Sequence, residues 1–90
     1  MNTIEQLEWA VFELATGSEG VHARLAKAYK HHLCFIVASE LPAELAPQFK
    51  SILARLGDGS KIAKLGTIKA RRIAMDIHRL SCELSQGLYH

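Results

Sequence analysis

Apolar residues recur every three or four positions in four separate segments of this chain. This spacing is typical of helices that bury one face. Glycine, serine and proline separate the segments, most clearly at residues 57–60, and no segment shows the alternation of a half-buried strand. We therefore predict an all-α fold, a small single-domain bundle of four antiparallel helices, over residues 3–16, 19–39, 47–56 and 67–86.

The length and composition agree with one soluble domain over residues 1–90. A chain of 90 residues has room for one hydrophobic core, and 49% hydrophobic residues are too many for a disordered chain. The longest apolar run, Leu33 to Ala38, spans six residues, whereas a membrane helix needs about 20. Two cysteines, Cys34 and Cys82, are too few for a disulfide framework. We expect a cytoplasmic protein with reduced thiols and no membrane partner.

Motifs that carry catalysis are missing from the sequence. It has no glycine-rich phosphate loop, no nucleophile elbow and no zinc-protease motif. His31 and His32 are adjacent, so on a helix they diverge by about 100° and do not chelate one ion. We expect a protein that is not an enzyme and has no catalytic residue, cofactor or metal site.

Some apolar residues lie outside the main stripes of their helices. Trp9 and Phe12 fall opposite the stripe of the first helix, and Ile68 and Met75 lie away from the stripe of the last. Trp9 and Phe12 are buried by a first helix that packs on both sides, form an interface, or are simply exposed. Two such apolar strips in one small domain favour an interface, because monomers seldom expose contiguous apolar surface. The leading hypothesis is a non-enzymatic protein–protein interaction module. It forms a homodimer, or binds another protein, through Trp9, Phe12, Ile68 and Met75.

Charge is unevenly distributed along the chain. Residues 1–45 carry three basic and six acidic groups, and residues 46–90 carry eight basic and three acidic groups. The alternation of Arg72, Asp76 and Arg79 favours a solvated helix face with paired charges. The alternative is nucleic-acid binding, through the basic residues Lys61, Lys64, Lys69, Arg71, Arg72 and Arg79.

A third hypothesis concerns the second predicted helix. Its apolar arc includes Phe35 and His32, and we interpret His32 as a core histidine with a hydrogen-bond partner. A pocket near Tyr29 and His32 would make the protein a small-ligand carrier or a minor enzyme.

Overall fold

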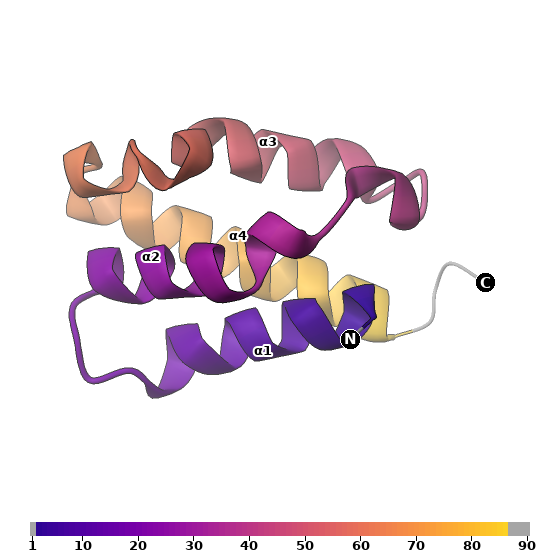
Figure 1. Cartoon of the computed structure of the whole chain (residues 1–90), viewed down its shortest axis with the longest axis horizontal. Helices are drawn as coiled ribbons and strands as arrows, with labels where there is room; N and C mark the ends of the chain where they lie inside the picture. Colours follow the sequence, from indigo (N-terminus) through magenta and orange to yellow (C-terminus); the bar gives the residue numbers. More distant parts are fainter. Residues whose placement is uncertain (1, 87–90) are drawn as a thin grey trace.

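The computed structural model describes residues 2–86, without the side chain of Asp58, and confirms the all-α bundle. Successive helices run in opposite directions, and no strand occurs in this part of the chain (Figure 1). The four helices are α1 (Thr3–Thr16), α2 (Val21–His31), α3 (Ala46–Leu56) and α4 (Thr67–Ser85). Short 3₁₀ turns lie in two of the connections: η1 (Leu33–Phe35) and η2 (Ala38–Glu40) between α2 and α3, and η3 (Gly57–Gly59) and η4 (Ile62–Lys64) between α3 and α4.

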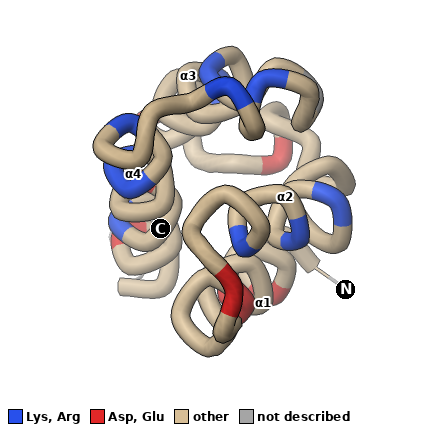
Figure 2. Tube along the Cα trace, turned by 90° about the vertical axis from the view of Figure 1, so that its left-hand side faces the viewer, with Lys and Arg blue, Asp and Glu red and all other residues tan. Residues whose placement is uncertain are grey.

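The helices surround one apolar core. Seen along the bundle, α1 packs against α2 and α4, which also contact each other, and α3 packs against α4 at the opposite side of the bundle from α1 (Figure 2). Each helix contributes side chains with no exposed surface, such as Leu7, Leu25, Phe49 and Ile77. The predicted stripes of the first, third and last helices are therefore the buried faces of α1, α3 and α4. None of the described helices has the length and apolar character needed to cross a bilayer.

The second helix is shorter than predicted. We expected residues 19–39, but α2 ends at His31, and the backbone of His32 leaves the helical region at φ −135° and ψ −57°. The following residues form η1 and η2, and they still bury Leu33 and Ile36. A 3₁₀ turn also places buried side chains three residues apart. Apolar spacing alone therefore does not separate these turns from a continued α-helix.

The break after α3 lies where the sequence predicts it. Gly57 adopts the left-handed conformation, with φ +53°, and its N–H donates to the carbonyl oxygen of Leu53. Glycine suits this position because it carries no Cβ. The chain then folds back through η4, where Ile62 is buried, before α4 begins at Thr67. The boundaries of α4 agree with the prediction to within one residue.

Candidate interaction surface

The structure places all four predicted interface residues on the outside of the bundle. The exposed fractions are 46% for Trp9, 54% for Phe12, 75% for Ile68 and 62% for Met75. The alternative that α1 packs on both sides and buries Trp9 and Phe12 is therefore wrong for this domain. Their aromatic surface is available to a partner.

On α1, two carboxylates flank the aromatic pair. The rings of Trp9 and Phe12 meet edge to face, with their centroids 5.4 Å apart. Together with Glu5 and Glu8 they line a shallow hollow of about 330 Å³, and we call these four residues the α1 face. Because α1 contains no lysine or arginine, this face is apolar and acidic.

On α4, three guanidinium groups accompany the exposed apolar side chains. Ile68, Arg71, Arg72, Met75 and Arg79 line a hollow of about 550 Å³, and we call them the α4 face. The expected pairing of charges along this helix is wrong. The carboxylate of Asp76, which also borders the hollow, is instead 2.8 Å from the guanidinium of Arg55 on α3. The α4 face is therefore apolar and basic.

A groove between α1 and α4 joins these two faces. It has a volume of about 530 Å³ and shares Met75 and Arg79 with the α4 face. Ala15 in its α1 wall is one helical turn from Phe12, so the groove borders the α1 face as well. Its lining residues are Val11, Leu14, Ala15, Ala74, Met75, His78, Arg79 and Cys82. The outer sides of α1 and α4 thus form one continuous surface with an apolar centre.

The six basic residues predicted to bind nucleic acid are all exposed. Among the side chains that the structure describes, no carboxylate lies within 4.0 Å of any of them. Figure 2 shows basic positions along α4 and the turns that precede it, whereas the charged positions of α1 are acidic. Lys61 and Lys64 lie in or beside η4, and the other four are on α4.

His32 lies at the contact between α1 and α2. Its side chain is 13% exposed, its Nδ1 is 3.3 Å from Oε1 of Gln6, and its ring stacks on Trp9 with centroids 6.4 Å apart. His31 Nδ1 lies 3.1 Å from Oε1 of Glu13, and His32 Nε2 lies 3.6 Å from the same oxygen. The predicted hydrogen-bond partner of His32 is therefore confirmed, but the residue is partly exposed and is not one of the buried core residues.

Tyr29 and His32 face different parts of the molecule. The ring of Tyr29 packs on Gly59 of η3. It lies so close that the Cβ of any other residue at position 59 would be 3.2 Å from the ring. His32 instead faces α1 through Gln6 and Trp9. The polar atoms of His32 are thus used in joining two helices.

We expect His32→Ala to change the fluorescence of Trp9, the only tryptophan. The substitution removes the ring stacked on the indole and a hydrogen bond to α1. The emission maximum should shift to longer wavelength, and the free energy of unfolding should fall by about 1 kcal/mol. His31→Ala is the control, because that side chain is 48% exposed and does not stack on Trp9. Equal emission spectra for the two variants would contradict the stacking role.

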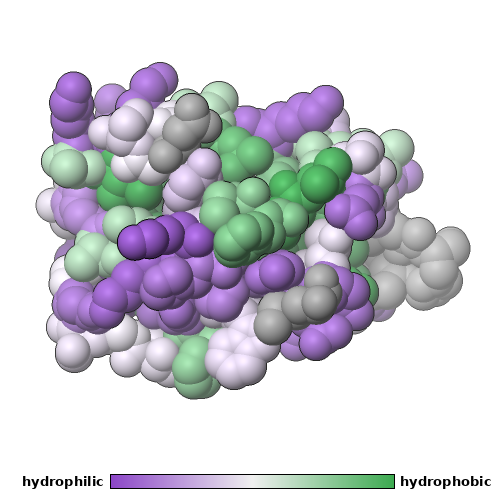
Figure 3. Space-filling view, viewed as in Figure 1, coloured by the Kyte–Doolittle hydropathy of each residue, from purple (hydrophilic) through white to green (hydrophobic). Residues whose placement is uncertain are grey.

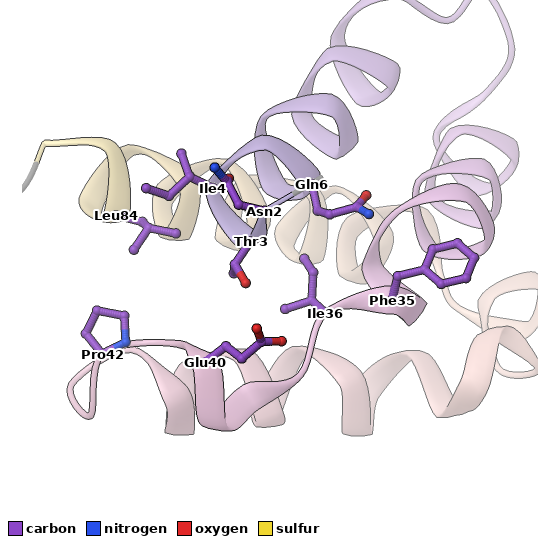
Figure 4. A pocket seen from close by; sticks show the side chains of 9 residues that line it. All are labelled: Asn2, Thr3, Ile4, Gln6, Phe35, Ile36, Glu40, Pro42 and Leu84. Carbon is purple, nitrogen blue, oxygen red and sulfur yellow. The ribbon is translucent and has the colours of Figure 1, made fainter.

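A second cleft, which the sequence analysis did not predict, lies at the start of α1. It measures about 460 Å³ and is bordered by residues of α1, the 35–42 segment and the end of α4. Thr3 and Glu40 project into it from opposite sides, whereas the ring of Phe35 points away (Figure 4). Phe35 and Val37 are 65% and 53% exposed, and apolar side chains gather over the connector that follows α2 (Figure 3). The expectation that Phe35 belongs to a buried arc is wrong, because α2 ends before it.

One ion pair that shifts the pKa values of both its partners lies outside this surface. Glu19, in the loop before α2, accepts a hydrogen bond from Lys27, which lowers the pKa of the Glu19 carboxyl and raises the pKa of Lys27. Both groups are exposed, so water screens the pair. Among the side chains that the structure describes, no three histidine, cysteine or acidic groups lie together so that they could hold a metal ion.

No family model matches the chain, and neither the curated proteins nor the solved structures contain a significant match.

Proposed function

We propose that this protein is a non-enzymatic helical interaction module that forms a homodimer through the outer sides of α1 and α4. The observation that carries the proposal is the continuity of three features: the α1 face, the groove and the α4 face. Trp9, Phe12, Ile68 and Met75 are at least 46% exposed on this surface. A monomer gains nothing from exposing large apolar side chains side by side, whereas a partner that covers them removes them from water.

The size of the domain also fits this function. A stable interface buries about 800 Å² on each partner, which is roughly a seventh of the 5484 Å² accessible surface of this chain. The 19 residues of α4 extend over about 28 Å and the 14 residues of α1 over about 21 Å. Two neighbouring helices of these lengths supply a face of the required size. Dimerisation also adds apolar contacts to a core that is small in a chain of this length.

The mass of the particle in solution tests this proposal. Light scattering behind a gel-filtration column should give about twice the chain mass of 10.0 kDa, decreasing towards 10.0 kDa on dilution. A mass of 10.0 kDa at every concentration up to about 1 mM would overturn the proposal, since the free energy of association would then be weaker than about −4 kcal/mol.

The unpaired basic residues support nucleic-acid binding as a second candidate function. Six exposed cations with no carboxylate within 4.0 Å among the described side chains favour a polyanion, because displaced counterions are released when phosphates bind. Duplex DNA titrated at low salt should bind, and its affinity should decrease steeply with added salt. Absence of binding at about 50 mM salt would remove this candidate.

A further inference from the structure

Two side chains that bind metals in many proteins lie together in the groove between α1 and α4. His78 and Cys82 are one turn apart on α4, both are exposed, and both line the groove. Sγ of Cys82 is 3.6 Å from Nε2 of His78. Thiolate and imidazole are the ligands that zinc prefers in structural sites. The pair therefore has the chemistry of half a structural zinc site, which takes four such ligands.

The distance between the two ligand atoms matches a shared zinc ion. Zinc lies about 2.3 Å from a thiolate sulfur and about 2.0–2.1 Å from an imidazole nitrogen, at a tetrahedral angle of about 109°. These values place the sulfur and the nitrogen about 3.6 Å apart. Sγ of Cys82 and Nε2 of His78 have this separation in the structure. Zinc can therefore replace the hydrogen bond between them with little movement of either side chain.

We propose that His78 and Cys82 of two copies together bind one zinc ion, in a site of two cysteines and two histidines within the dimer interface. This inference rests on the proposed self-association and adds a metal to its interface. A two-fold interface brings the residues nearest its axis against their own counterparts. The pair lies in the groove that joins the α1 face to the α4 face. A two-fold axis over the groove at the level of this pair unites the two half-sites.

Both ligand number and charge favour a site shared by two copies. Among the side chains that the structure describes, no third histidine, cysteine or acidic group joins His78 and Cys82. Two thiolates neutralise one Zn²⁺ ion, whereas one thiolate leaves a net charge of +1. Arg79 lines the same groove, so its guanidinium repels a half-site but not the neutral complete site. An unpaired charge is also costly to bury in an interface.

Titration of the chain with zinc and with cobalt tests the site. A chelator first removes bound metal, and a phosphine keeps the thiols reduced. Calorimetry should give one zinc ion for two chains. Sedimentation velocity should show that zinc lowers the dissociation constant of the dimer at least about tenfold, because the ion binds the dimer and not the separate chains. Cobalt should give the visible absorption of tetrahedral thiolate coordination. Cys82→Ser and His78→Ala should each remove these responses.

Cys34→Ser is the matched control for the loss of a thiol. Cys34 is also exposed, but it lies in η1 and its thiol donates to the backbone carbonyl oxygen of Lys30. Its replacement should leave zinc binding and the dissociation constant unchanged. His78, Cys82 and Cys34 are all exposed, so each variant should keep the circular dichroism spectrum of the natural chain.

The outcomes separate this site from the proposed function. A chain that is monomeric with and without zinc overturns the proposed function itself. A dimer that binds one zinc ion per chain, or whose dissociation constant zinc leaves unchanged, overturns the shared site and leaves self-association standing. Zinc binding that survives both Cys82→Ser and His78→Ala places the ion elsewhere and likewise overturns the site.

Discussion

Replacing Met75 by lysine is expected to convert the dimer into a monomer. Met75 lies where the groove meets the α4 face, so the proposed interface covers it completely. A lysine there would place its ammonium group in the apolar centre, beside Arg71 and Arg79, while the nearby Asp76 carboxylate is already paired with Arg55. Burying an unpaired charge is among the most costly changes that an interface can receive. We expect the dissociation constant to rise at least about 100-fold.

Sedimentation velocity over a range of concentrations measures this effect, with Val37→Lys as the control. Val37 is an apolar residue with 53% exposure, close to the 62% of Met75, but it lies in the connector between η1 and η2. Its replacement should leave the mass near twice 10.0 kDa. Both variants should keep the helical content of the natural chain, because neither side chain belongs to the core. An undiminished mass for Met75→Lys would place the interface elsewhere.

Phe49→Ala is expected to cause the largest loss of stability in this domain. Phe49 is fully buried, from α3, and it is the largest side chain in the core. Removing a buried phenylalanine ring costs about 3–5 kcal/mol. A domain of 90 residues is stable by about 5–13 kcal/mol. The variant should therefore retain little stability and unfold at a much lower urea concentration.

Phe35→Ala provides the comparison within the same residue type. Its ring is 65% exposed, so the free energy of unfolding should fall by less than about 1 kcal/mol. Urea titration followed by circular dichroism at one protein concentration compares the two variants. Similar losses for both would show that α3 does not contribute the centre of the core.

Helical spacing predicted most of the fold because buried side chains repeat with the helix. It located α1, α3 and α4 from residues such as Leu7, Phe49 and Ile73. It failed after His31, where the chain leaves the α-helical conformation while Leu33 and Ile36 remain buried. The spacing of apolar residues indicates which side chains are buried, but an α-helical turn and a 3₁₀ turn both agree with a spacing of three residues.

The candidate surface was predictable in part. The four predicted interface residues, Trp9, Phe12, Ile68 and Met75, lie opposite the apolar stripes of their own helices. The residue spacing within each single helix is therefore enough to predict them. The groove depends instead on how α1 and α4 are rotated against each other, which core packing decides. The partner of Asp76 was missed for the same reason, since Arg55 comes from another helix. Local charge spacing does not contain that information.

The ion pair between Arg55 of α3 and Asp76 of α4 affects the charge of the α4 face, although α3 contributes no residue to that face. Asp76 is the only acidic residue between positions 61 and 80, and it borders the hollow of the α4 face. While Arg55 holds its carboxylate, Asp76 is not free to neutralise Arg72 or Arg79, its neighbours on the helix. The third helix thereby sets the electrostatic potential that an approaching partner meets on the fourth.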